Sequence, residues 1–202
     1  MRAQTLSPVA GWGWILTGFA IFRRNPITLG MLVLTYWFTV VSLNVLPYVG
    51  ALLASLVIPG LSVGLMQAAR QVERGLPIGV QTLFGSMKEN GRTLIALGAL
   101  YLACTLGILG LSTLLDGGDM FRFMMSSNRA ERAALEEADF ITPALFVMAL
   151  MTPVMMAYWF APVLAAWHRL TLGRALFFSF VACWMNWRAF LVYGAGLLLA
   201  AG

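Results

Sequence analysis

One serine in the chain stands in a pattern that is typical of nucleophilic catalysis. Ser62 is the centre of Gly60-Leu61-Ser62-Val63-Gly64, which matches the G-x-S-x-G sequence of many hydrolases. Such a serine needs a histidine base within hydrogen-bonding distance, and the single histidine, His168, lies at the basic end of a different apolar segment. The same five residues read as Gly-x-x-x-Gly, a spacing that lets two helices approach closely. We therefore predict that Gly60 and Gly64 pack against another helix, and we expect no catalytic residue.

The other reactive side chains give no sign of a metal or cofactor site. The two cysteines, Cys104 and Cys183, stand far apart in apolar sequence, and neither has a partner at metal-ligand spacing. We interpret both as small core residues. The long apolar segments hold no Asp, Glu, Lys or Arg, which are the residues that ion-coupled carriers use inside a membrane. The sequence therefore predicts no metal, no cofactor and no enzymatic activity.

The elements that position these residues are long apolar segments. Hydrophobic residues make up 60% of the chain and charged residues only 10%, whereas soluble domains carry about 25% charged residues. The uncharged segments are residues 27–45, 48–69, 93–115 and 141–166, followed by a shorter one at 189–202. About 20 helical residues cross the hydrocarbon layer, and none of the segments alternates polar and apolar residues as a barrel strand would. The sequence predicts an all-α, polytopic transmembrane helix bundle with four complete spans and a fifth, truncated span.

Charge placement predicts the orientation of these spans. Ten Lys and Arg residues and only two acids lie before the first span, between the second and third, or between the fourth and fifth. The loop of residues 116–140 carries three basic and six acidic residues instead. Because basic residues near span ends stay in the cytoplasm, we expect a cytoplasmic amino terminus and a periplasmic loop 116–140. The basic residues are spread over separate loops, so we expect no nucleic-acid binding.

The basic residues beside the spans are the candidate contacts with other molecules. Lys and Arg side chains at this depth attract anionic lipid head groups. We expect membrane lipids as partners, together with a membrane-protein partner or a second copy of the chain. The candidate residues are Arg23, Arg24, Arg70, Arg74, Lys88, Arg92, Arg169 and Arg174.

An internal repeat organises the chain. Three times a short amphipathic segment ends at an asparagine and a long apolar segment follows, at Asn25, Asn90 and Asn186. An Asn side chain can accept a hydrogen bond from the first free amides of the next helix. We therefore predict an interfacial amphipathic helix, a capping asparagine and a span in each repeat.

The repeat also predicts how the chain is divided. A single transmembrane domain, residues 1–202, would hold repeat units of about residues 8–75 and 76–173 and an incomplete unit of residues 174–202. All units enter the membrane from the same side, so they are parallel repeats. The third unit lacks its second span, and we expect the natural chain to continue past Gly202 and complete a sixth span.

Two stretches carry a resemblance to a known family. They are Pro59 to Met66, followed by Arg70, Glu73 to Pro77 and Leu83-Phe84, and Ala175 to Ser179. Through them most of the chain resembles an uncharacterised proteobacterial integral inner-membrane protein family, similar in style to the membrane domain associated with glycerophosphodiester phosphodiesterases. The resemblance implies a helical protein of the bacterial inner (plasma) membrane, and it implies no activity and no catalytic residues.

The sequence leaves two functions open. The first is a non-catalytic scaffold, assembly or lipid-organising protein whose cytoplasmic interfacial helices form a basic, aromatic collar. The second is a transporter or channel for a small uncharged or amphipathic solute, with spans that kink at Pro59 and Pro162 around a cavity. A polar cavity at the middle of the membrane favours the transporter, whereas a core packed with Gly, Ala and Leu favours the scaffold.

Overall fold

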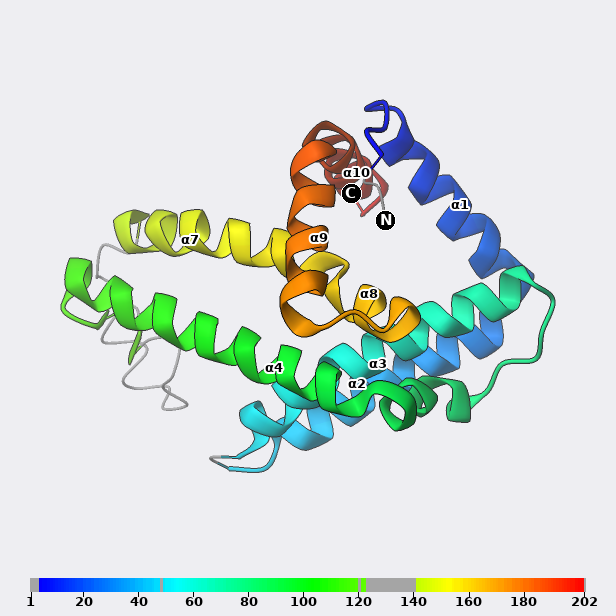
Figure 1. The fold of residues 1–202 in the computed structure, drawn as a ribbon, viewed down its shortest axis with the longest axis horizontal. Helices are drawn as coiled ribbons and strands as arrows, with labels where there is room; N and C mark the ends of the chain where they lie inside the picture. The colour runs from blue at the N-terminus through cyan, green and yellow to red at the C-terminus, as the bar shows by residue number, and fades with distance from the viewer. Residues whose placement is uncertain (1–3, 48, 120, 123–140, 202) are drawn as a thin grey trace. The chain divides into compact units, whose positions relative to one another are not determined.

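The chain forms helices joined by turns and breaks. The computed structural model describes residues 4–47, 49–119, 121–122 and 141–201, which contain no strand, so the all-α prediction is confirmed for this part of the chain. Most of the predicted periplasmic loop lies outside the described residues. In chain order the helices are α1 (Ala10–Arg24), α2 (Pro26–Asn44), α3 (Gly50–Glu73), α4 (Val80–Asp116), α7 (Ile141–Trp159), α8 (Ala161–His168), α9 (Leu172–Met185) and α10 (Trp187–Ala201) (Figure 1).

Four helical segments are long and apolar enough to cross a membrane. They are Pro26–Asn44, Gly50–Glu73, Asn90–Asp116 and Ile141–His168. These segments match the four predicted spans, although α3 continues beyond residue 69 and carries its basic residues on helical backbone. Helices α9 and α10 together meet the same criteria as one broken span, with a bend of 77° between them. The fifth apolar segment is therefore a helix set at a steep angle to the helix before it.

Each repeat asparagine marks a break between two helices. The backbone angles φ and ψ are −150° and 67° at Asn25, −132° and 25° at Asn90, and −114° and 18° at Asn186. These values all lie outside the α-helical range. The breaks separate α1 from α2, divide α4, and separate α9 from α10. The structure thus shows the order of helix, asparagine and apolar helix at all three positions.

The two prolines of the second spans differ in their effect. Helix α3 runs through Pro59 without a break, as a single helix. In the segment 141–168 the helix is interrupted at Phe160, and α8 begins just after it with Pro162 in its first turn. Proline is favoured there because its missing N–H would have no helical partner at that position.

The chain divides into two compact units. The larger unit contains Met1–Ala99 and Met156–Gly202, and the smaller contains Leu100–Met155. In the smaller unit the fully buried hydroxyl of Ser112 donates a hydrogen bond to the Leu109 carbonyl, at 2.8 Å. A hydroxyl that bonds to its own helix brings no unpaired polar group into an apolar environment. The candidate site described below lies wholly in the larger unit.

In the larger unit, α3 packs closely against the first part of α4 at two glycines. A Cβ atom at Gly64 would overlap the Leu83 carbonyl, and a Cβ at Gly60 would overlap the Met87 side chain. Residue numbers rise along α3 as they fall along α4, so the two helices are antiparallel. Gly60 and Gly64 therefore lie at a close helix–helix contact, which is what the Gly-x-x-x-Gly spacing permits.

A third close contact in the larger unit lies farther along the same helix pair. A Cβ atom at Gly98 of α4 would overlap the Ser55 carbonyl of α3. Proline has no N–H, so Pro59 cannot donate the helical hydrogen bond to the carbonyl four residues earlier, which is that of Ser55. The Ser55 carbonyl, which has no helical hydrogen-bond donor, is thus the carbonyl that Gly98 of α4 approaches.

Apolar side chains fill the larger unit. One cluster joins α2, α3 and α4 and the other joins α3, α4, α8 and α9. Their buried members are Leu29, Leu32, Leu61, Ala68, Val72 and Leu83 in the first, and Val63, Leu94, Leu97, Ala161, Ala165 and Ala175 in the second. Helices of a membrane protein associate mainly through van der Waals packing of such residues.

Helix α1 packs along α10 through a small residue and an aromatic pair. A Cβ atom at Gly11 would overlap the Ala189 carbonyl, and the rings of Trp14 and Phe190 meet edge to face with their centroids 5.3 Å apart. Away from this contact α1 exposes several large apolar side chains, including Phe19. At 15 residues α1 is shorter than a span. An apolar face with a basic end suits a helix that lies in the membrane interface.

Candidate functional site

Three contacts bring the basic ends of separate helices together. The Arg24 guanidinium donates to the Glu73 carbonyl at 3.0 Å, which joins the end of α1 to the end of α3. The Arg70 guanidinium lies 4.8 Å from the centroid of the Trp167 ring, which joins α3 to the end of α8. These two contacts join the basic ends of α1, α3 and α8 within the larger unit.

The third contact comes from an asparagine of the repeat. The Asn90 side chain donates from Nδ2 to the Ala166 carbonyl at 3.0 Å, and so joins the break in α4 to the last turn of α8. The last carbonyls of a helix have no partner inside the helix. In both of the predicted complete repeat units, a side chain at or next to the first break donates to a late carbonyl of the second span: Arg24 to Glu73, and Asn90 to Ala166.

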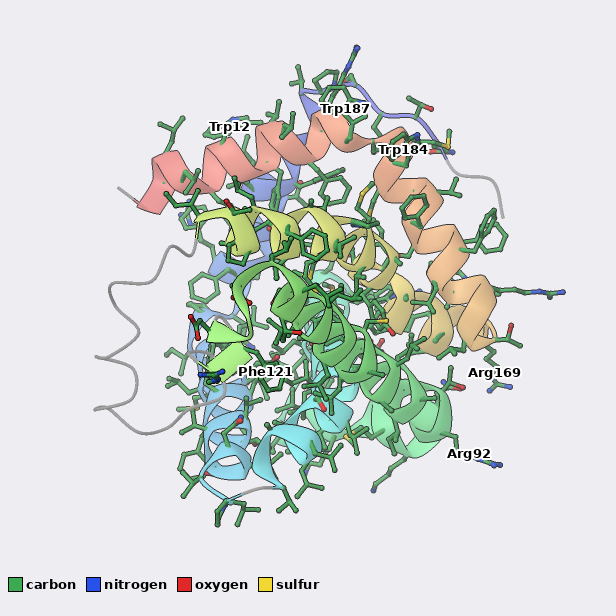
Figure 2. The ribbon with its side chains drawn as sticks, turned by 90° about the vertical axis from the view of Figure 1, so that its left-hand side faces the viewer. Trp12, Arg92, Phe121, Arg169, Trp184 and Trp187 are labelled. Carbon is green, nitrogen blue, oxygen red and sulfur yellow. The ribbon has the colours of Figure 1, made fainter. Side chains whose placement is uncertain are left out.

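We call the eight basic residues at these helix ends the basic collar: Arg23, Arg24, Arg70, Arg74, Lys88, Arg92, Arg169 and Arg174. All are exposed except Arg70, which is half-buried against Trp167. Figure 2 shows Arg92 and Arg169 projecting outward on the same side of the ribbon. Among the described side chains, no collar residue forms an ion pair with a carboxylate.

A polar pocket of about 380 Å³ lies between the helices that carry the collar. Its polar lining consists of amide and hydroxyl side chains, and Trp167 also lines it. The lining residues are Val63, Gln67, Gln71, Gln81, Thr82, Gly85, Asn90, Ala166 and Trp167. They come from the second half of α3, the first part of α4 and the end of α8. The pocket therefore lies toward the ends of three spans.

Part of the pocket's hydrogen-bonding capacity is used within the protein. The Thr82 hydroxyl donates to Gln71 Oε1 at 3.2 Å and accepts from the Gly79 amide at 3.4 Å. The side-chain amides of Gln67 and Gln81 form no hydrogen bond with any described residue. The sequence analysis missed this pocket. Its one signal was the placement of Gln67 and Gln71 four residues apart, on one face of an otherwise apolar helix.

The three repeat asparagines use their side chains differently. Asn25 Oδ1 accepts from the Thr28 amide at 3.3 Å and caps α2. The side chain of Asn186 differs from the predicted cap, because its Oδ1 accepts from the Leu6 amide at 2.7 Å and its Nδ2 donates to the Gln4 carbonyl at 2.9 Å. Asn186 is buried, and it fixes the segment before α1 to the break between α9 and α10.

The serine of the G-x-S-x-G pattern, Ser62, is not among the residues that line the polar pocket. Ser62 lines a shallow apolar groove between α2 and α3, beside Tyr36 and Trp37. His168 is exposed at the end of α8, and no hydrogen bond joins it to Ser62. Cys183 is buried and Cys104 is half-buried, and both thiols are free. Among the described residues, no three His, Cys, Asp or Glu side chains are grouped so as to hold a metal ion.

Comparison with known proteins places the chain in a family. No protein-family model matches the sequence, and no solved structure matches it. The similarity to membrane domains associated with glycerophosphodiester phosphodiesterases therefore stays a prediction from the sequence. The chain is 37% identical over 200 residues to the Burkholderia thailandensis protein named "Probable inner membrane protein BTH_II0599", an alignment that covers 96% of this chain and 74% of that protein. With its several membrane-length helices, the chain thus belongs to the family of this bacterial inner-membrane protein and is itself a multi-pass inner-membrane protein.

Proposed function

We propose that the chain is a non-catalytic, lipid-organising scaffold of the inner membrane that binds anionic lipids through the basic collar. The observation that carries this proposal is the collar itself, in which the Arg24–Glu73 and Arg70–Trp167 contacts join the basic ends of α1, α3 and α8. The contacts with Trp167 and Glu73 leave the charges at the surface. Each Lys or Arg near an anionic surface contributes about 1 kcal/mol of attraction, so several together give a clear preference for anionic lipids.

Aromatic residues support the same placement. Trp184 and Trp187 are exposed on either side of the break between α9 and α10, and the exposed Trp12 lies farther along α10, beside Gly196; all three are labelled in the upper part of Figure 2. Tryptophan is enriched at the membrane–water interface, where its ring lies at head-group level. The helices α1 and α9 each have an exposed arginine near one end and exposed tryptophan near the other. This arrangement suits helices that lie flat beneath the head groups.

The proposal includes an orientation. The collar would lie in the cytoplasm together with the amino terminus, and the acidic loop 116–140 would lie in the periplasm, because basic residues are retained on the inner side. Transport is the less favoured function. The polar pocket lies toward the ends of three spans, and the described buried clusters of the larger unit consist of Leu, Ala and Val.

The test compares lipid binding before and after removal of the collar charges. Purified protein in a neutral detergent is titrated with dioctanoyl phosphatidylglycerol and with zwitterionic dioctanoyl phosphatidylcholine, and bound lipids are counted by native mass spectrometry. The triple variant Arg70→Ala, Arg74→Ala and Lys88→Ala should lose about tenfold or more of the preference for the anionic lipid. A charge-conserving triple, Arg70→Lys, Arg74→Lys and Lys88→Arg, should keep it.

A matched control removes the same number of charges from the acidic loop. Arg122→Ala, Arg129→Ala and Arg132→Ala should leave the lipid preference unchanged, because these residues lie outside the collar. Thermal unfolding of every variant establishes that it is folded. If the wild-type protein binds both lipids equally, or if the loop variant loses as much as the collar variant, the proposal is wrong.

A further inference from the structure

The lining of the polar pocket suits hydroxyl groups. Three glutamines, one threonine and one asparagine face it, and its described lining residues include no charged side chain. A side-chain amide both donates and accepts hydrogen bonds, so it can pair with a hydroxyl in either direction. A bare phosphate or carboxylate would call for Arg or Lys within the lining, and a metal ion would call for carboxylates. The chemistry of the pocket therefore points to a neutral, hydroxyl-bearing group.

The depth of the pocket identifies where such a group would come from. Gln67 and Gln71 stand in the last turns of the span that ends at Glu73. Ala166 and Trp167 stand at the end of the span Ile141–His168. These positions are at head-group level if the spans cross the bilayer. The part of the pocket lined by the glutamines, Ala166 and Trp167 is thus at the depth of the lipid head groups.

A positive charge next to the pocket could bind the phosphate of a lipid whose head group enters the pocket. The Arg70 guanidinium rests 4.8 Å above Trp167, whose side chain lines the pocket, so one collar cation stands at its edge. The amides of Gln67 and Gln81 have no partner among the described residues and are available to a ligand. The volume of about 380 Å³ is near the lower limit for small-molecule pockets, which suits a head group rather than acyl chains.

We infer that this pocket holds the hydroxyl-bearing head group of an anionic phospholipid, with the glycerol hydroxyls among the amides and the phosphate beside Arg70. This inference rests on the proposed function, since it makes one collar position selective for head-group chemistry as well as for charge. It concerns binding alone, and no bond is made or broken.

The experiment compares two lipids of equal charge. Dioctanoyl phosphatidylglycerol and dioctanoyl phosphatidylmethanol each carry a single negative charge, but only the first has free hydroxyls. The wild-type protein in neutral detergent should bind phosphatidylglycerol about tenfold more tightly, as expected for one or two additional hydrogen bonds. Native mass spectrometry gives both dissociation constants.

Two variants fill or alter the pocket without disturbing packed residues. A Cβ atom at Gly85 meets nothing within 4 Å, so Gly85→Leu should fill the pocket and abolish the difference between the lipids. Gln81 is exposed, and Gln81→Leu should reduce the difference by removing one amide. The matched control is Gly107→Leu, on the same helix, where a Cβ is equally free and the residue does not line the pocket. It should bind like the wild type.

The outcomes separate this inference from the proposed function. If the wild type binds the two anionic lipids equally, and both more tightly than phosphatidylcholine, the inference about the pocket is wrong, but the proposed binding of anionic lipids by the collar is supported. Equal binding of all three lipids overturns both. Displacement of phosphatidylglycerol by an equal concentration of free glycerol 1-phosphate would identify a soluble polyol phosphate as the ligand and overturn the lipid assignment. Loss of the preference for phosphatidylglycerol in the control Gly107→Leu would also contradict the assignment of the head group to this pocket.

Discussion

Asn25, Asn90 and Asn186 hold the same place in three repeats, yet their side chains bind different partners. Asn25 bonds to its own helix, Asn90 to the end of α8, and Asn186 to the segment before α1. The backbone break is common to all three, because a short polar side chain tolerates non-helical backbone angles and competes for nearby amides. The backbone break is therefore common to the three positions, whereas the hydrogen-bond partner of each Asn side chain depends on the segments packed around it.

The buried Asn186 side chain should hold the amino-terminal segment in place. We expect Asn186→Ala to expose the Leu6 amide, since it removes the 2.7 Å hydrogen bond from that amide and the 2.9 Å bond to the Gln4 carbonyl. Loss of a buried polar pair costs about 1–3 kcal/mol. Hydrogen exchange at Leu6 should therefore accelerate at least about tenfold.

The control for this prediction is Asn25→Ala. That change removes only the local cap on Thr28 and should cost about 1 kcal/mol without altering exchange at Leu6. If Leu6 exchanges equally slowly in the Asn186 variant and the wild type, the side chain does not anchor the segment.

Replacement of Gly64 should disturb the contact between α3 and α4. A Cβ atom at Gly64 would overlap a backbone carbonyl, that of Leu83, which cannot rotate away as a side chain can. We expect Gly64→Ala to lower the free energy of unfolding by about 1–3 kcal/mol through forced separation of α3 and α4. Thermal unfolding in detergent measures the change. Gly30→Ala on α2, where a Cβ meets nothing within 4 Å, should have no such effect, and an equal loss in both variants would refute the packing argument.

At the scale of helices, much of the fold could be predicted from the sequence. Uncharged runs of membrane length located the four spans, and the three Asn positions located the breaks. The carboxyl end of α3 was harder to predict, because the Gln and Arg residues after Ala69 form helix as readily as the apolar residues before them. The pocket could not be predicted, since it depends on which helix ends meet, and pairing across long sequence separations leaves little trace in one sequence.

Pro59 and Gly98 should act as a coupled pair between α3 and α4. Gly98→Ala places a Cβ against the Ser55 carbonyl, and we expect it to destabilise the protein. Pro59→Ala restores a helical donor to that carbonyl and should draw it back into α3, so that it lies farther from residue 98. The double variant should then be more stable than the sum of the single effects implies, by about 0.5–3 kcal/mol.

Unfolding of the single and double variants by denaturant or heat gives this coupling energy. Additivity of the two effects to within about 0.5 kcal/mol would show that the two residues act independently. Gly107→Ala combined with Pro59→Ala supplies the control, because Gly107 has open space around its Cα and should show additive effects.

At the scale of the whole molecule, the collar and the acidic loop should lie on opposite sides of the membrane. The loop between α3 and α4, residues 74–79, lies between the collar residues Arg70 and Lys88 in the sequence, whereas the segment after Asp116 begins the acidic loop. Because Lys and Arg near span ends resist export, alkaline phosphatase fused after Leu76 should be inactive, and the same enzyme fused after Gly117 should be active. A green fluorescent protein fused at each site should give the opposite pattern, which controls for failed expression. Phosphatase activity at residue 76, or fluorescence at residue 117, would mean that the collar faces the periplasm. The collar could then still bind anionic lipid, but in the outer leaflet.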